Sequence, residues 1–257
     1  MSTTAIRDTT TMLRRNLRHM QRFPMMSIGT IGMPVLMMLL FVHVFGGSLD
    51  TTIPGGASYV DYLVPGILVM AVGAGAAWTS VNINTDMGEG IIARFRTMAI
   101  SRYSVLTGQA LSSLLNTALT LALVIGVALL NGFRPSAGPA DWLAAAGLLL
   151  LIAFAFTWLG IAFGMGAKTV AGANSSALPL QFLPFVSSAF VPTDSMSSGL
   201  VWFAGHQPFT PITDTLRGLL VGTPVGDSGY WAVGWCLVLS AVGYARSRVL
   251  FDRDPSR

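Results

Sequence analysis

Charged side chains are scarce in this 257-residue sequence: Asp, Glu, Lys and Arg together make up 10% of it, whereas 53% of the residues are hydrophobic. Soluble domains are typically about one quarter charged. A soluble chain of this length also needs a polar surface to face water. The shortage of charge therefore excludes a soluble fold and predicts a membrane protein, with lipid in place of water over much of the surface.

The sequence also lacks the residue sets that most catalytic and metal sites require. Its single cysteine, Cys236, excludes an internal disulfide, and we expect it to pack among the apolar residues around it. No GxxxxGKS or GxxxxGKT phosphate loop occurs; the nearest segment, residues 166–169, lacks the adjacent Gly-Lys pair. No convergent set of nucleophile, base and metal ligands can be assembled. We expect a non-catalytic chain with no cofactor or metal of its own.

Long apolar runs dominate what is present. Crossing the hydrocarbon layer takes roughly 20 apolar residues per helix, and backbone groups that face lipid must be paired within the helix. The runs predict an all-α, polytopic membrane protein with six transmembrane helices that follow a cytoplasmic segment, residues 1–24. Within the membrane domain, residues 25–257, the approximate spans are 25–45, 60–81, 105–130, 142–166, 174–192 and 228–245.

The basic residues predict the orientation, because loops rich in Lys and Arg stay in the cytoplasm. Of the fifteen, only Arg134 and Arg217 fall outside if both termini are cytoplasmic. The others are Arg7, Arg14, Arg15, Arg18, Arg22, Arg94, Arg96, Arg102, Lys168, Arg246, Arg248, Arg253 and Arg257. They are dispersed between apolar runs, so the net charge of +4 forms no face for nucleic acid. We expect a multi-pass protein of the inner or plasma membrane with both termini inside.

The N-terminal segment is amphipathic on a helical wheel. Its apolar residues Ile6, Leu13, Leu17 and Met20 share one narrow sector. Its basic residues occupy another: Arg7, Arg14, Arg15, Arg18 and Arg22. Such a helix lies in the headgroup layer and binds membrane lipid through its arginines. The alternative is a solvated tail whose arginines only set the topology.

A second amphipathic segment lies between the second and third predicted spans. Its apolar residues follow the i, i+1, i+4, i+7, i+8 spacing of one helix face, as Ile91, Ile92, Phe95, Met98 and Ala99. Its charged residues Glu89, Arg94 and Arg96 lie off that face. A short helix of this kind can dock in a groove of another protein. Alternatively, it lies on the membrane surface.

The outward segment 193–227 is too long and too apolar for a plain loop. Thr210 can cap a helix that Pro211 begins. An apolar stripe follows, made of Ile212, Leu216, Leu219 and Leu220. We expect helices here that dip into the membrane without crossing it, and a structural Asp214–Arg217 pair worth under about 1 kcal/mol if exposed.

The fifth span contains two prolines, Pro179 and Pro184. Each removes a backbone donor and can kink a helix, so both are candidate gating residues. Proline is also frequent in membrane helices that have no such role. In the fourth span, Gly160 and Gly164 form a small-xxx-small pattern that permits close helix approach, and we expect them to serve packing.

Several motifs resemble the ABC-2 permease family, especially its daunorubicin-resistance-type branch. Residues 89–102, EGIIARFRTMAISR, are similar to the coupling segment of that family. Later matches are 185–192 with 193–196, 207–211 and 214–218, and 132–135 resembles the turn after the third span. The chain departs from the family at Ala99, where proline is common, and at Gln207, where asparagine is commoner.

The resemblance implies six spans, a homodimeric or paired permease core and a separate ATP-binding subunit that carries ATP and Mg. That subunit would contact the N-terminal helix and the coupling residues, which are Glu89, Ile92, Arg94, Phe95, Arg96, Met98 and Arg102. The expected function is the permease of an ATP-driven exporter of an amphipathic or lipophilic substrate: an antibiotic, drug or lipid. The alternative is a secondary transporter or channel without an ATPase partner. Ion-coupled transporters usually need buried titratable groups. His43, near the outward end of the first predicted span, is the only ionisable side chain clearly inside one, which counts against this alternative.

Overall fold

The computed structural model describes residues 24–49, 58–89, 102–192 and 196–253, and all regular structure within these ranges is helical. The predicted all-α class is confirmed for this part of the chain. In chain order the elements are α2 (Pro24–Leu40), the π-helix η1 (Phe41–Phe45), α3 (Gly46–Leu49), α4 (Tyr59–Gly88), α6 (Arg102–Leu130), α7 (Pro139–Gly166), α8 (Val170–Phe182), the 3-10 helix η4 (Leu183–Val186), α9 (Ser198–His206), α10 (Phe209–Val221) and α11 (Ser228–Arg253).

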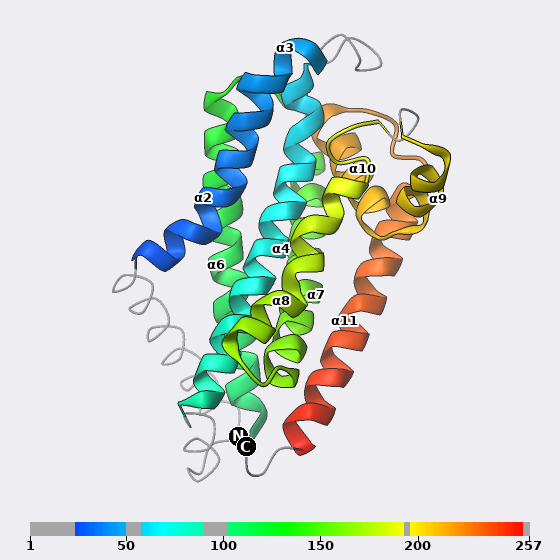
Figure 1. Cartoon of the computed structure of the whole chain (residues 1–257). Helices are drawn as coiled ribbons and strands as arrows, with labels where there is room; N and C mark the ends of the chain where they lie inside the picture. Colours follow the sequence, from blue (N-terminus) through cyan, green and yellow to red (C-terminus); the bar gives the residue numbers. More distant parts are fainter. Residues whose placement is uncertain (1–23, 50–57, 90–101, 193–195, 254–257) are drawn as a thin grey trace.

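Helix α4 is the centre of the bundle (Figure 1). It packs against α2, α6, α7, α8 and α10, and every residue from Tyr62 to Ala77 is buried. A helix that is apolar on all sides belongs inside a bundle rather than on its surface. Ser58 begins the helix, because its Oγ accepts a hydrogen bond from the N–H of Val60 at 3.4 Å.

Glycines on α7 allow close contact with α4. A Cβ atom placed on Gly160 would lie 2.5 Å from the carbonyl oxygen of Ala76, and one on Gly164 would lie 2.4 Å from that of Ser80. Both distances are too short for a side chain, so only glycine permits this helix spacing. The predicted packing role of the pair is confirmed.

Three described helices are long and apolar enough to cross a membrane: Tyr59–Gly88, Leu106–Leu130 and Pro139–Gly166. They overlap the predicted second, third and fourth spans. A shorter apolar helix, Ile31–Phe45, overlaps the first. The count of six spans stays a prediction.

The predicted fifth span is interrupted. Helix α8 ends at Phe182, η4 follows, and residues 187–192 are not helical, contrary to the expectation of a helix to Pro192. Pro184 explains the change, because it has no N–H to donate to the carbonyl of Leu180 one turn earlier. Helix α11, at the predicted sixth span, continues past residue 245 to Arg253.

Helices α9 and α10 lie beside the end of the bundle where α4 begins (Figure 1). We name this end, with residues 58–66, 187–192 and α10, the outward end, following the predicted orientation. The opposite end, with residues 84–88 and 165–168, is the cytoplasmic end. The predicted apolar stripe of α10 is buried at Ile212, Leu216 and Leu220, and α10 ends at Gly222, whose φ of 82° suits glycine.

Candidate functional site

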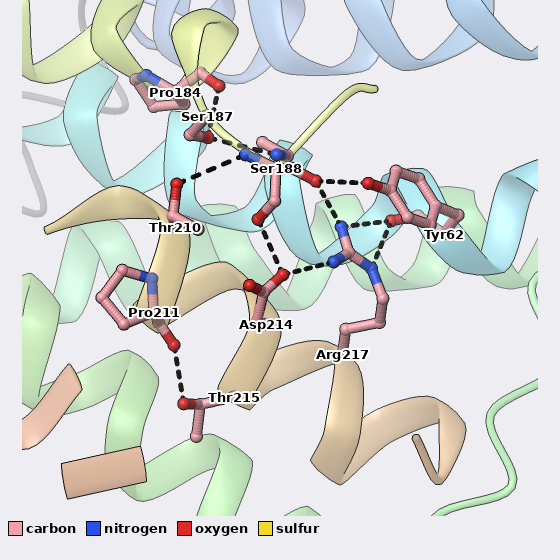
Figure 2. A network of polar contacts seen from close by, with 10 residues as sticks. Tyr62, Pro184, Ser187, Ser188, Thr210, Pro211, Asp214, Thr215 and Arg217 are labelled. Carbon is pink, nitrogen blue, oxygen red and sulfur yellow. Dashed lines mark hydrogen bonds and ion pairs between the residues drawn. The ribbon is translucent and has the colours of Figure 1, made fainter. Parts of the chain in front are cut away.

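Arg217 is buried at the outward end, with a side chain that is 10% exposed. Figure 2 shows its guanidinium group between Asp214, Ser188 and Tyr62. Nη1 donates to Asp214 Oδ1 at 2.6 Å, and Nη2 donates to the Ser188 carbonyl at 2.7 Å. Nε and Nη2 both donate to the Tyr62 carbonyl at 3.3 Å. The buried cation is therefore paired with one carboxylate and two backbone carbonyls.

The partners of Arg217 also bond to one another. Ser188 Oγ donates to Asp214 Oδ1 at 2.7 Å, and Tyr62 Oη donates to the Ser188 carbonyl at 2.8 Å. The Arg217 Cζ atom lies 3.8 Å from the centroid of the Tyr62 ring, within the range of a cation–π interaction. We call Tyr62, Ser188, Asp214 and Arg217 the arginine network. It joins α4, α10 and the segment after η4.

Two further contacts hold the segment after η4. The Ser188 N–H donates to Thr210 Oγ1 at 3.4 Å, and Gln207 Nε2 donates to the Val186 carbonyl. Within the segment, Ser187 Oγ donates to the Pro184 carbonyl at 2.6 Å and accepts from the Ala189 N–H at 3.1 Å (Figure 2). Side chains thus replace the helical hydrogen bonds that end near Pro184.

One expectation about α10 needs correction, and another is confirmed. Thr210 does not cap the helix: α10 begins at Phe209, Pro208 is its N-cap residue, and the Thr210 hydroxyl accepts from Ser188 instead. The Asp214–Arg217 pair forms as predicted, with the Arg217 side chain 10% exposed and that of Asp214 35% exposed. The buried member is the cation, so loss of its partners costs more than loss of a surface pair would.

The two candidate gating prolines have different surroundings. Pro179 is exposed on α8, whereas Pro184 is buried in η4. The Leu180 carbonyl, to which Pro184 cannot donate, faces Gly73 of α4; a Cβ atom on Gly73 would lie 2.2 Å from its oxygen. Farther along the contact, a Cβ atom on Gly66 would lie 2.6 Å from the Ala189 carbonyl oxygen. The proline-interrupted segment therefore rests directly on the backbone of α4.

At the cytoplasmic end, Asn84 and Ser80 join α4 to neighbouring elements through uncharged groups. Asn84 Nδ2 donates to the carbonyls of Gly164 at 3.0 Å and Ala167 at 2.8 Å, and Ser80 Oγ donates to the Ala173 carbonyl at 2.9 Å. A cavity of about 430 Å³ opens here, lined by Asn84, Met87, Gly88, Met165, Gly166, Ala167 and Lys168. Three of its lining residues, Asn84, Met87 and Gly88, come directly before the predicted coupling segment 89–102 in the sequence.

Most of the predicted coupling residues lie outside the described residues, as Ile92, Arg94, Phe95, Arg96 and Met98 do. Glu89 is the exposed C-cap residue of α4, and Arg102 is the first residue of α6. The arginines of the predicted interfacial helix, Arg7, Arg14, Arg15, Arg18 and Arg22, also lie outside the described residues. Their roles stay predictions.

Sequence reasoning missed most of the arginine network. The i, i+3 spacing shows the Asp214–Arg217 pair, but Tyr62 lies 155 residues from Arg217 and carries no local signal. In the sequence, Tyr62 is distinguished only as an aromatic residue near the start of the second predicted span, 60–81. Asn84 gave a weak signal, since it is an amide within a long apolar helix, where polar side chains usually bond across helices.

Comparison with known proteins agrees with this architecture. The sequence profile of the ABC-2 type transporter family matches residues 7–221. The chain is 31% identical over 242 residues to the daunorubicin resistance ABC transporter permease protein DrrB1 of Streptomyces coeruleorubidus, which covers 93% of this chain and 82% of that protein. It is 26% identical over 234 residues to the probable doxorubicin resistance ABC transporter permease protein DrrC of Mycobacterium tuberculosis, in strains CDC 1551 and H37Rv, covering 86% of this chain and 82% of DrrC. This chain therefore belongs to the ABC-2 type transporter family of membrane permeases.

Proposed function

We propose that this chain is the membrane-spanning subunit of an ATP-driven ABC exporter. It moves an amphipathic or lipophilic substrate, such as an antibiotic, drug or lipid, out of the cytoplasm or the inner leaflet. The observation that carries the proposal is the similarity over 93% of the chain to a permease named for daunorubicin resistance. The apolar helices supply the membrane domain that such a subunit needs.

In this proposal the chain does not hydrolyse ATP. A separate ATP-binding subunit carries ATP and Mg, and it contacts the segment 89–102 and the N-terminal helix on the cytoplasmic side. The permease works as a homodimer or paired permease in the inner or plasma membrane, with both termini inside. ATP binding supplies a differential free energy between two arrangements of the helices that substrate alone does not supply.

The interruption of α8 supports a role for Pro179 and Pro184 in gating. A segment without continuous helical hydrogen bonds can change shape with less disruption than a straight helix. Its contacts with Gly66 and Gly73 place it directly against the central helix α4, so a movement of this segment would require α4 to adjust. Pro184 is the stronger candidate, because it is buried at the break itself.

Co-purification tests the partner. The permease is expressed with the ATP-binding subunit encoded in the neighbouring reading frame, and the ratio of the two chains is measured after purification through a tag on the permease. Phe95→Asp places a charge on the apolar face of the coupling segment, so we expect the ratio to fall at least several-fold while membrane insertion stays normal. Phe95→Leu is the matched control and should retain the partner. An unchanged ratio for Phe95→Asp would remove the docking role.

A further inference from the structure

Five phenylalanine rings meet near the outward end, brought together from two distant parts of the chain. Phe41 and Phe45 lie on η1, whereas Phe182 ends α8, Phe185 lies on η4 and Phe190 follows it. The Phe185 and Phe190 rings are stacked with centroids 4.4 Å apart and planes at 3°. Phe41 lies 5.0 Å from Phe190 and 5.5 Å from Phe45, and Phe182 lies 6.0 Å from Phe185. We call these rings the phenylalanine cluster.

The cluster is buried at one side and open at the other. Phe190 is 3% exposed, while Phe45 and Phe182 are 43% and 45% exposed. Aromatic rings attract further rings in offset or edge-on geometry, and a partly exposed ring has an unused surface for such a contact. The five side chains carry no charge, so the exposed side offers aromatic surface and shape rather than an ionic partner.

The local backbone is unusual at the same place. Residues 41–45 form a π-helix that continues from α2. Single π-helical turns within α-helices are rare and are found frequently at functional sites. This turn carries both Phe41 and Phe45 into the cluster, so the irregular backbone and the exposed rings coincide.

The exposed face of α8 next to Phe182 is not purely apolar. Asn174 and Ser175 are exposed on it, and Ser175 shares a helix face with Phe182 seven residues later. Both side chains can donate and accept hydrogen bonds. The exposed face of α8 therefore offers polar groups and the Phe182 ring to an amphipathic solute.

We propose that the phenylalanine cluster is a stacking site for the flat, polycyclic aromatic part of a transported substrate. The proposal rests on the proposed exporter function and narrows its substrate class. Two relatives are named for resistance to daunorubicin and doxorubicin, both of which contain fused flat rings. The rings would stack beside Phe182 and Phe185, and the polar part of the substrate would lie along α8 near Ser175.

The site is also connected to the arginine network. The Phe190 carbonyl accepts a hydrogen bond from Tyr59 Oη at 3.3 Å, and Ser188, two residues earlier, bonds to Asp214 and Arg217. Through Phe190, the cluster is therefore continuous with the contacts that hold α10 against α4.

Doxorubicin binding tests the proposal, with quenching of its fluorescence as the signal. The permease and its ATP-binding subunit are reconstituted together in lipid nanodiscs without nucleotide, and doxorubicin is titrated. Phe185→Leu should raise the Kd about tenfold, because it removes the central ring of the stack. Phe185→Tyr keeps the ring and should stay within about twofold of the wild type. Phe154→Leu, on α7 and 40% exposed, is the matched control and should leave the Kd unchanged.

The outcomes separate this site from the exporter function. If Phe185→Leu binds as the wild type does, if Phe154→Leu causes the same loss, or if the wild type does not bind doxorubicin, the stacking site is wrong. If doxorubicin binds at the cluster but ATP drives no transport, the site stands and the exporter function fails. Should Phe185→Leu not assemble with its partner, Phe182→Leu replaces it, because an exposed ring can be removed without opening the core. It should raise the Kd several-fold, and an unchanged Kd would overturn the proposal.

Discussion

The two ends of the bundle are held together by different kinds of contact. At the outward end, one buried arginine joins α10, the start of α4 and the segment after η4 through a carboxylate, two carbonyls and a tyrosine ring. At the cytoplasmic end, α4, α7 and α8 are joined by glycine contacts and by neutral side chains that donate to carbonyls. Among these contacts of the described residues, those of the outward end include an ion pair, whereas those of the cytoplasmic end are neutral hydrogen bonds and close packing at glycine.

The difference teaches how each end responds to change. A buried guanidinium that loses its partner, or a partner that loses the guanidinium, leaves a charge with little solvent around it. The contacts of Asn84 and Ser80 are individually weaker, since hydrogen bonds between membrane helices average about 0.6 kcal/mol. The cytoplasmic end also opens into a cavity of about 430 Å³. We therefore expect the outward end to tolerate substitution less well than the cytoplasmic end.

The largest effect is expected from removing the central cation. Arg217→Met removes the cation that pairs with Asp214 and donates to the carbonyls of Tyr62 and Ser188, so the free energy of unfolding should fall by about 3 kcal/mol. The thermal midpoint of the purified permease in detergent measures the loss. Arg134→Met is the matched control: Arg134 is exposed at the same end, and water can replace its two hydrogen bonds to the carbonyls of Leu129 and Phe133, so the loss should stay under about 1 kcal/mol. Equal shifts for the two variants would show that the network does not hold α10.

A smaller effect is expected from adding one methyl group at the cytoplasmic end. Gly164→Ala would place a Cβ atom 2.4 Å from the Ser80 carbonyl oxygen, so α4 and α7 must separate. Overpacking of this kind costs about 1–3 kcal/mol. Gly147→Ala on the same helix is the control, since its Cβ atom would meet nothing within 4 Å. The comparison fails if both variants melt at the wild-type temperature.

The smallest effect is expected from Asn84→Ala, which removes two hydrogen bonds, one to Gly164 in the last turn of α7 and one to Ala167 directly after it. At the average value for membrane helices the two bonds together are worth about 1 kcal/mol. Asn82→Ala, two residues earlier on the same helix and partly exposed, serves as the control. A loss for Asn84→Ala larger than that for Arg217→Met would reverse the order of the two ends.

Features set by local periodicity could be predicted from the sequence. The apolar runs predict the helices α4, α6 and α7. Residue spacing alone predicts the packing pair Gly160 and Gly164 and the apolar stripe of α10. Cys236 is fully buried, as an isolated cysteine in an apolar run suggests. These features depend on residues within one or two helical turns of one another.

Features that depend on the tertiary fold could not be predicted in the same way. Tyr62 and Arg217 lie 155 residues apart, and the ring contact of Phe41 with Phe190 likewise joins distant segments. The proline at position 184 indicates a possible break in the helix. It does not indicate that the segment after the break packs against Gly66 of α4. Thr210 shows the same limit, because its hydroxyl bonds to a distant N–H rather than to its own helix.

Transport into inside-out membrane vesicles tests the central claim most directly. The vesicles contain the permease with its ATP-binding subunit, and doxorubicin accumulation is followed after ATP is added. We predict accumulation that needs both subunits and ATP, and that is lost when the phosphate-loop lysine of the ATP-binding subunit is replaced by alanine. Accumulation by the permease alone, driven by an ion gradient without ATP, would contradict the account and identify a secondary transporter.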